Sequence, residues 1–374
     1  MRPLNVLHLT THINLGGITS YISTLSKALA RKGHHSSIVS AGGNASVLLT
    51  RSGVCCYDFP IRTKSELNPK IWWTLPQIVS LVKEERFDLM HAHTRVTQVL
   101  AYFISKWTSV PYLSTAHGFY TPRIGRRIFP AWGARVIAIS SLVAEELERA
   151  HRVPAAKIRL VHNALDLEPF EKRLGQQDRQ WMKQRYGIPQ DAFVVGSVSR
   201  LVRDKGHEYL VEAVQALLAS HPKVFLLIVG DGREKENLEG LMQRSINGRS
   251  RLVPGVQDTT AVLAMMDVFV HPATRREGFG LSIAEAMVAK IPVIATDIPA
   301  INTLLENGEN GLVVEPKSAS ALAGAIEGLM RDPEQAKKIA RKGYETAVSL
   351  CRPERMADEV EQVYEEVLNG WKKH

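Results

Sequence analysis

Along the chain, short apolar runs rich in β-branched residues alternate with longer stretches in which apolar residues recur every three or four positions. Runs of the first kind predict buried strands, and stretches of the second kind predict helices with one apolar face. The strands predicted in this way are 5–10, 87–91, 111–116, 135–140, 158–162, 193–198, 224–229, 268–271 and 292–296. The predicted helices are 17–31, 96–107, 142–150, 207–219, 235–244 and 282–289, followed by a mostly helical tail from about 318.

Strands that alternate with helices form parallel sheets whose two faces are both covered. The alternation stops in the polar stretch 171–190 and then restarts. We therefore expect an α/β protein with two doubly wound domains, at 1–168 and 191–350, joined by a linker at 169–190. Ligands of such sheets bind at the carboxyl ends of the strands, so the chemistry is expected in the loops that follow strands.

The composition is that of a globular protein, with 45% hydrophobic and 23% charged residues among 374. This excludes a mainly disordered chain, and only three cysteines exclude a disulfide scaffold. No stretch approaches the roughly 18–20 apolar residues that a membrane-spanning helix needs. The apolar run near the first residue is too short for a signal peptide, so we expect a cytoplasmic protein.

The net charge of +9 is unevenly distributed. Residues 1–165 hold 20 Lys+Arg against 8 Asp+Glu, a net of +12, whereas residues 166–374 hold 27 against 30, a net of −3. A basic half of this kind favours an anionic partner such as nucleic acid, a membrane surface or a phosphate-bearing substrate. A solubility function is the alternative.

Two loops combine features that suit a phosphate. The loop after the first strand carries Gly16 and Gly17 at the start of a helix, where paired glycines allow close approach of a ligand to free backbone N–H groups. It lacks the G-x-G-x-x-G pattern, which disfavours NAD. The second loop places Arg200 and Lys205 before a helix, where cations are favourable if an anion lies between them and the helix. An ordinary turn and solvated surface cations are the alternatives.

A third loop, at 275–287, follows a predicted strand and contains two glycines between two glutamates. Glu277 can accept hydrogen bonds from hydroxyl groups, and the next helix supplies N–H donors. Glu285 stands three residues after Ser282, so a capping box explains it as well as a functional role does.

The histidines near strand ends indicate a function less specifically than these loops do. His91 and His93 are a candidate metal pair without a carboxylate partner, and a structural or substrate-contacting role is favoured. No Asp-x-Asp pair, P-loop or zinc-type spacing occurs. We therefore expect no metal and no cofactor, with Arg200 and Lys205 supplying positive charge instead.

In this order, these loops resemble those of glycosyltransferase family 4, retaining nucleotide-sugar enzymes of the GT-B fold, in which two Rossmann-like domains face a cleft. The most specific part is the run 277–285, Glu-Gly-Phe-Gly-Leu-Ser-Ile-Ala-Glu, which is similar to the paired-glutamate signature of the family. The other matching positions are Gly16-Gly17, His117-Gly118, residues 161–166, Gly196 with Arg200, Lys205-Gly206 and Gly230-Asp231-Gly232.

The resemblance implies roles for individual residues. Arg200 and Lys205 would bind the donor diphosphate, Glu277 would accept hydrogen bonds from the donor sugar, and His117 would contact that sugar. The other donor-binding residues that it implies are Gly16, Gly17, Gly230, Phe279, Gly280, Leu281 and Glu285, the last on the ribose hydroxyls. A helix at about 353–374 would return to complete the first domain.

These roles leave no carboxylate beside the anomeric carbon, so the resemblance implies retention by front-face return, without metal. The departing diphosphate, stabilised by Arg200 and Lys205, would deprotonate the acceptor. We expect transfer of a hexose-type sugar from a UDP-sugar, with GDP as the alternative, to a polysaccharide or lipid-linked glycan such as lipopolysaccharide. A nucleotide-sugar epimerase of the same fold and a non-catalytic nucleotide-sugar-binding module are the competing functions.

In such enzymes the acceptor binds mainly the first domain, which is the basic half here. Cations and aromatic residues mix in two segments, 117–132 and 68–73, and the candidate acceptor or membrane residues are Arg123, Arg126, Arg127, Trp72 and Trp73. This mixture suits an anionic membrane surface or a lipid-linked acceptor. We expect a peripheral enzyme on the cytoplasmic face of the inner membrane that does not bind nucleic acid, since recognisable nucleic-acid-binding modules are missing.

Overall fold

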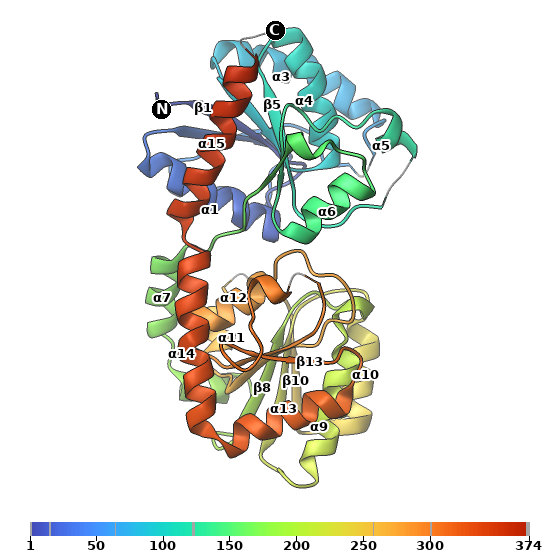
Figure 1. Cartoon of the computed structure of the whole chain (residues 1–374), viewed down its shortest axis with the longest axis vertical. Coiled ribbons are helices and arrows are strands. Elements are labelled where there is room, and N and C mark those ends of the chain that lie inside the picture. The colour runs from blue at the N-terminus through green and yellow to red at the C-terminus, as the bar shows by residue number, and fades with distance from the viewer. Residues whose placement is uncertain are drawn as a thin grey trace. The chain divides into compact units, whose positions relative to one another are not determined.

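The computed structural model describes residues 2–14, 16–63, 65–121, 124–256, 258–299 and 301–371. The chain forms two compact units (Figure 1). The first unit is Met1–Ala164 with Arg352–His374, and the second is Leu165–Cys351.

The first unit is built on a seven-stranded sheet in the order β3-β2-β1-β4-β5-β6-β7, in which every pairing is parallel. Its strands are β1 (Asn5–Leu9), β2 (His35–Ser40), β3 (Cys55–Asp58), β4 (Leu89–Ala92), β5 (Tyr112–Ala116), β6 (Val136–Ala138) and β7 (Ile158–Leu160). Its helices are α1 (Gly17–Arg31), α2 (Ser46–Arg51), α3 (Pro69–Glu84), α4 (Arg95–Thr108), α5 (Ile124–Ile128), α6 (Ser141–Arg149) and α15 (Pro353–Trp371), with a 3-10 turn at Ala155–Lys157.

The core of the first unit lies between the central strands and the apolar faces of α3 and α4. Strands β4 and β5 are buried along their whole length because helices cover both faces of the sheet. The crossover from β5 to β6 differs from the others, because its helix, α5, has only five residues.

The last helix belongs to the first unit, where α15 packs against α1. Acidic residues of α15 pair with cations of the first 160 residues: Glu354 with Arg31, Asp358 and Glu361 with Lys32, and Glu366 with both Arg135 and Arg159. The helix therefore neutralises part of the basic surplus that the sequence places in this half.

The second unit has a six-stranded parallel sheet in the order β10-β9-β8-β11-β12-β13. Its strands are β8 (Phe193–Val198), β9 (Val224–Val229), β10 (Ser250–Val253), β11 (Val268–His271), β12 (Val293–Thr296) and β13 (Leu312–Val314). Its helices are α7 (Leu167–Gly175), α8 (Arg179–Arg185), α9 (His207–Leu218), α10 (Lys235–Ile246), α11 (Thr260–Leu263), α12 (Leu281–Val288), α13 (Ala319–Arg331) and α14 (Pro333–Leu350), with 3-10 turns at Arg203–Lys205 and Ile301–Thr303.

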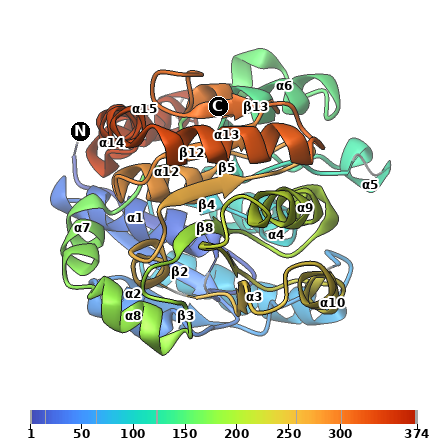
Figure 2. The same cartoon turned by 90° about the horizontal axis from the view of Figure 1, so that it is seen from below.

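Helices cover both faces of this second sheet (Figure 2). Helix α9 packs against α10 and α13, whereas α12 packs against α14. The core is formed by Val, Leu and Ile side chains of β8, β9 and β11 with the apolar faces of α9 and α13. The all-apolar strand β9, buried at every position, is the hydrophobic run expected of a central parallel strand.

Several elements were not predicted from the sequence pattern. Strands β2, β3, β10 and β13 and helix α3 are among them. Three of the four strands are short strands at or next to a sheet edge, where polar residues such as those of β3 and β10 blur the apolar run. The stretch 169–190, expected as a linker, carries α8 and most of α7.

Candidate active site

The loops at the carboxyl ends of β8 and β11 carry the charged candidate-site residues Arg200, Lys205 and Glu277 of the second unit. From β8 the chain continues to β9 on one side, and β11 lies on the other side, so that the strand order reverses here. In an open α/β sheet such a switch point is the expected ligand site. Arg200 and Lys205 follow β8, Gly230 follows β9, and Glu277 follows β11. The structure therefore brings together residues that lie 72 positions apart in the sequence.

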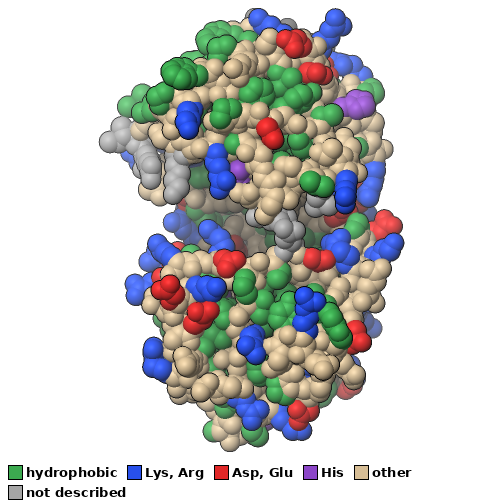
Figure 3. Space-filling view, turned by 180° about the vertical axis from the view of Figure 1, so that it is seen from behind, with side chains coloured by type: hydrophobic (Ala, Val, Ile, Leu, Met, Phe, Trp, Pro, Cys, Tyr) green, Lys and Arg blue, Asp and Glu red, His purple; other side chains and the backbone are tan. Residues whose placement is uncertain are grey.

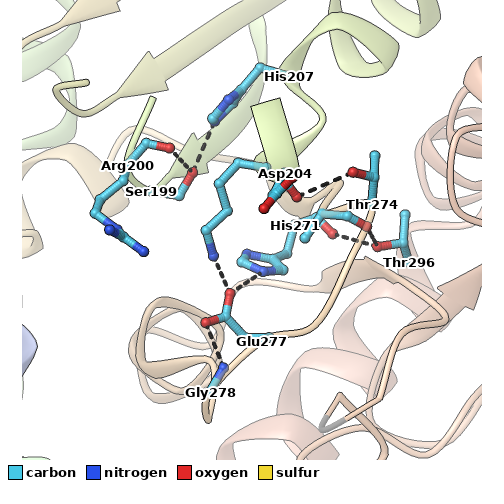
Figure 4. A network of polar contacts seen from close by, with 11 residues as sticks. Ser199, Arg200, Asp204, His207, His271, Thr274, Glu277, Gly278 and Thr296 are labelled. Atoms are coloured by element: carbon cyan, nitrogen blue, oxygen red, sulfur yellow. Dashed lines mark hydrogen bonds and ion pairs between the residues drawn. The ribbon is translucent and has the colours of Figure 1, made fainter. Parts of the chain in front are cut away.

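The carboxylate of Glu277 is the centre of a polar network. The Nζ of Lys205 donates to Oε2 of Glu277, and Nε2 of His271 lies 3.0 Å from the same oxygen. The backbone N–H of Gly278 donates to Oε1 over 3.0 Å. Figure 4 shows Glu277 lying between His271, the last residue of β11, and its own loop at Gly278.

These partners determine the charge of the network. Burial acts to raise the pKa of the Glu277 carboxyl, but the hydrogen bond from His271 and the positive charge of Lys205 outweigh it, and the pKa lies well below its ordinary value. Burial lowers the pKa of His271. Glu277 is therefore an anion at neutral pH, and a neutral His271 that donates from Nε2 holds it in place.

Arg200 presents an exposed cation beside this network. Its side chain makes no ion pair with any residue that the structure describes. The neighbouring Ser199 hydroxyl lies 2.9 Å from Nε2 of His207, and burial lowers the pKa of His207 to about 4. A guanidinium that is not committed to a carboxylate is available to a diphosphate, which it can bind with two parallel hydrogen bonds.

Two glycines of these loops are required by close packing. A Cβ at Gly230 would lie 1.9 Å from the carbonyl oxygen of Ser199. Gly206 has a φ of +62°, and a Cβ there would lie 2.1 Å from the carbonyl oxygen of Pro272. Gly230, predicted as a donor-binding residue, therefore has a structural reason for its identity, since it lets β9 end against the loop that carries Arg200.

Helix α12 begins without a side-chain cap. Its N-cap is Gly280, in the left-handed conformation, and no side chain bonds the first N–H groups. The capping-box interpretation of Ser282 and Glu285 is therefore wrong, because the helix begins before Ser282. The backbone N–H groups at the start of α12, after Gly280, have no side-chain cap and can donate hydrogen bonds to an anion. The buried side chain of Phe279 anchors the loop that precedes them.

Glu285 does not cap α12, and its side chain lies near Thr259. The Thr259 hydroxyl donates to Oε2 of Glu285 over 3.1 Å. Burial raises the pKa of Glu285 to about 7, against the opposing effect of the hydrogen bond from Thr259. A half-buried carboxylate with one remaining oxygen is suited to accept hydrogen bonds from a pair of hydroxyl groups.

In the first unit the strand order reverses between β1 and β4. Gly16 and Gly17 follow β1 and begin α1, again without a side-chain cap. A Cβ at either glycine would meet no atom within 4 Å, so packing does not explain them. Uncapped N–H groups at the start of a helix can bind a phosphate.

His117 follows β5 and ends a row of three histidines. Its Nε2 lies 3.0 Å from Nδ1 of His93, and Nε2 of His93 lies 3.0 Å from Nδ1 of His8 on β1. Beside the row, His91 bonds the hydroxyls of Tyr364 and Thr115 at 2.9 and 2.6 Å. Ring nitrogens of His8, His91 and His93 all lie within 4.8 Å of one another. These three are the residues that could hold a metal ion within the described part of the chain.

The predicted acceptor residues have different environments. Trp73 is 82% exposed, whereas Trp72 packs edge-on against Phe103. The guanidinium of Arg126 stacks over the rings of Tyr120 and Trp132 at 4.5 and 5.1 Å, and Arg127 is exposed. Arg123 lies outside the described residues. On the face shown in Figure 3, Lys and Arg side chains lie among apolar and acidic ones.

A cavity of about 820 Å³ opens in the first unit beside α5. Aromatic residues including Tyr102, Phe129 and Trp371 line it, together with the cations Lys106, Arg127, Arg135, Arg152 and Lys157. Its carboxylate, Glu366, is already shared by two arginines. The cavity is therefore basic and aromatic. No helix within the described ranges combines the length and apolar character needed to cross a membrane.

The family models divide the chain in two. Residues 15–169 match the model "Glycosyltransferase Family 4", and residues 178–346 match "Glycosyl transferases group 1". The chain belongs to glycosyltransferase family 4.

Relatives of this family-4 glycosyltransferase are similar over most of their length. An N-acetyl-alpha-D-glucosaminyl L-malate synthase of Bacillus anthracis is 22% identical over 96% of this chain and 96% of its own. A UDP-Gal:alpha-D-GlcNAc-diphosphoundecaprenol alpha-1,3-galactosyltransferase of Escherichia coli is 27% identical over 68% of this chain and 69% of its own. These similarities extend across both units.

Solved structures show that the fold is GT-B. A glycosyltransferase from Rickettsia africae superposes with a TM-score of 0.85 at 22% identity, covering 98% of this chain and 99% of that one. HepE from Anabaena, in complex with UDP and glucose, superposes with a TM-score of 0.82 at 21% identity, covering 97% and 100%. The predicted fold class is confirmed.

Some residues of the candidate site were not predicted from the sequence. His271 was predicted only as a strand residue, although its place at the end of the strand before Glu277 was a usable signal. Thr259 and His207 contact Glu285 and Ser199, but nothing in the local sequence indicates this. His8 lies in a predicted strand, 85 residues from His93, so that only the sheet register brings them together.

Proposed function

We propose that this enzyme transfers a hexose-type sugar from a nucleotide diphosphate sugar, preferably a UDP-sugar, to a polysaccharide or lipid-linked glycan acceptor of the cell surface. The observation that carries this proposal is the network of Lys205, His271 and the ionised Glu277 beside the free cation of Arg200. Cations that can bind a diphosphate and a carboxylate that can accept hydrogen bonds from sugar hydroxyls lie together at one switch point of the sheet. GDP remains the alternative carrier.

In this proposal Arg200, Lys205 and the N–H groups at the start of α12 bind the diphosphate, and Glu285 binds the ribose. Glu277 accepts hydrogen bonds from the sugar, and the loop backbone from Phe279 to Leu281 contacts the donor. In the first unit, Gly16 and Gly17 approach the donor phosphate, and His117 contacts the sugar. The solved HepE complex holds UDP and glucose, which supports a UDP donor by analogy.

We propose retention of the anomeric configuration without a metal. Lys205 and His271 hold one oxygen of Glu277. In this proposal the carboxylate also accepts hydrogen bonds from the sugar hydroxyls, so it is not positioned as a nucleophile. The leaving diphosphate then accepts the proton of the acceptor, and Arg200 and Lys205 stabilise its developing charge. NMR of the product in the first minutes of reaction gives the anomer, and unchanged turnover after chelation tests metal independence.

The first test is a panel of nucleotide sugars screened for thermal stabilisation. A ligand that binds the folded state raises the unfolding temperature. At a ligand concentration of 100 times its Kd, the free energy of unfolding rises by about 2.7 kcal/mol. We expect a UDP-sugar to stabilise the protein. We also expect the enzyme to release UDP from this donor only when an acceptor is present. Conversion of the donor in the absence of an acceptor would instead indicate an epimerase, and binding without turnover a non-catalytic module.

For the acceptor, we propose a lipid-linked glycan at an anionic membrane surface on the cytoplasmic face. Exposed apolar residues stand next to cations around the basic, aromatic cavity: Trp107 follows Lys106, and Ile128 follows Arg127. The relative from Escherichia coli, named for a diphosphoundecaprenol acceptor, supports this class. Flotation with phosphatidylglycerol vesicles at low salt tests it, and Arg127→Ala should weaken binding, whereas absence of binding by the unaltered enzyme would exclude attachment.

A further inference from the structure

Three histidine rings form one hydrogen-bonded row inside the first unit. The row runs from His8 on β1 through His93, just after β4, to His117, just after β5, and each link measures 3.0 Å between ring nitrogens. His8 and His93 are fully buried, and His117 is partly accessible. Only the pairing of β1, β4 and β5 side by side creates this row.

All three rings are neutral at physiological pH. Burial lowers the pKa of His8 and of His117 to about 3, and it lowers that of His93 well below its usual range. A neutral imidazole has one N–H donor and one bare nitrogen that accepts. Each ring in the row therefore uses one nitrogen as donor and the other as acceptor.

Such a row has only two consistent arrangements. Because each link needs one donor and one acceptor, the proton position on one ring determines the position on the next. Either His8, His93 and His117 all carry the proton on Nδ1, or all carry it on Nε2. Any mixture places two donors or two bare nitrogens against each other and loses a hydrogen bond.

The buried end of the row distinguishes the two arrangements. Nε2 of His8 is buried and has no hydrogen-bond partner among the residues that the structure describes. Protons on Nε2 throughout would leave an unpaired N–H in the core, and such groups are rarer in proteins than unfilled acceptors. Protons on Nδ1 leave only a bare nitrogen there.

We propose that His8 and His93 fix the tautomer of His117, so that His117 presents an N–H at Nδ1 to an oxygen of the nucleotide-sugar donor. At this end of the row, no described residue bonds Nδ1 of His117. His8 and His93 are positioning residues, since they act through His117. The oxygen that receives the hydrogen bond depends on the proposed function, but the tautomer does not.

A metal ion bound by His8, His91 and His93 is the competing explanation for this cluster. Three neutral imidazoles can ligate zinc, but each ligating ring nitrogen must then be free of other hydrogen bonds. Both ring nitrogens of His91 are already engaged by Tyr364 and Thr115. Both ring nitrogens of His93 are likewise engaged, by His8 and His117. Metal content is measured in the test.

The direct test is NMR of the unliganded full chain with ¹⁵N-labelled histidine near pH 7.5. Correlations between ring nitrogens and ring C–H groups distinguish Nδ1–H from Nε2–H. We expect Nδ1–H for His8, His93 and His117, assigned by the signals lost in His8→Phe, His93→Leu and His117→Gln, with the exposed His35→Gln as control. Nε2–H or a cationic ring at His117, or about one equivalent of bound metal, would overturn the proposal.

Kinetics with the best UDP-sugar of the donor panel tests the positioning role. His93→Leu removes the link to His117, and loss of one ordered hydrogen bond should lower kcat/KM about tenfold, mainly through a higher donor KM. In His93→Gln the side-chain amide can still bond Nε2 of His117, so this variant should recover part of the lost kcat/KM. A mere loss of folded protein lowers kcat at unchanged KM, and that pattern would refute positioning. If no donor reacts, the proposed function fails, while the NMR result still decides the tautomer.

Discussion

Nε2 of His271 lies 3.0 Å from Oε2 of Glu277, six residues further along the chain. His271 is the last residue of β11 and is buried, so the strand holds its ring and the ring holds the carboxylate of the loop. Lys205, from the loop after β8, reaches the same oxygen. One carboxylate thus joins two loops and remains charged.

Replacing Glu277 by Gln should therefore abolish most activity without unfolding the protein. The amide keeps the volume but removes the negative charge that Lys205 and His271 share. We expect kcat/KM to fall by at least about 100-fold, the size of effect seen when one preorganised electrostatic group is removed. Steady-state kinetics measures it, and a circular dichroism melt establishes folding. Near-normal kcat/KM would contradict the assignment of Glu277 to the donor sugar.

Arg200→Ala should reduce both donor affinity and turnover. Its guanidinium has no ion pair within the described part of the chain, so its removal breaks no structural contact, and loss of a charge-assisted pair to phosphate costs about 1.5–3 kcal/mol. Arg203→Ala, three residues away in the same exposed loop, is the matched control and should leave the kinetics nearly unchanged. Unchanged turnover in Arg200→Ala would exclude a role at the leaving group.

Donor binding should strengthen as the pH rises through 7. Burial raises the pKa of Glu285 to about 7, so the carboxylate that accepts from ribose hydroxyls is only half formed at that pH. Isothermal titration with UDP between pH 6 and 8 should show rising affinity. Glu285→Gln should lose this dependence, and Thr259→Val, which removes the hydrogen bond favouring the anion, should move the midpoint to higher pH. A flat profile in the unaltered enzyme would exclude Glu285 as the titrating group.

Gly230→Ala should destabilise the second unit. The new methyl group would lie 1.9 Å from the carbonyl oxygen of Ser199, so the loop that carries Arg200 must move. We expect the free energy of unfolding, measured in urea, to fall by about 1–3 kcal/mol, the range typical of overpacked sites. Gly324→Ala is the control, because that position lies in α13 with open space around it, and alanine should there be neutral or stabilising by up to about 1 kcal/mol. Equal effects of the two changes would contradict the packing argument.

The order of strands and helices was largely predictable, because buried parallel strands such as β9 and amphipathic helices such as α1 leave local patterns. Helix α1 has the predicted bounds, and so do β8, β9 and β11. Short strands near the sheet edges carry no such pattern, and β3 and β10 were missed for that reason. The capping interpretation of Glu285 failed because the start of α12 depends on the left-handed conformation of Gly280, which the sequence permits but does not require.

The local sequence indicates which residues can do the chemistry: an arginine and a lysine after one strand, paired glutamates after another, and glycines at two helix starts. The charge and hydrogen bonds of these residues depend on the folded structure. Strand order puts Lys205 and His271 on one oxygen of Glu277, and burial raises the pKa of Glu285 while lowering those of the histidines. The acids of α15 likewise reach the basic half only after folding. Charge and proton position depend on neighbours that are distant in sequence, so a local pattern cannot specify them.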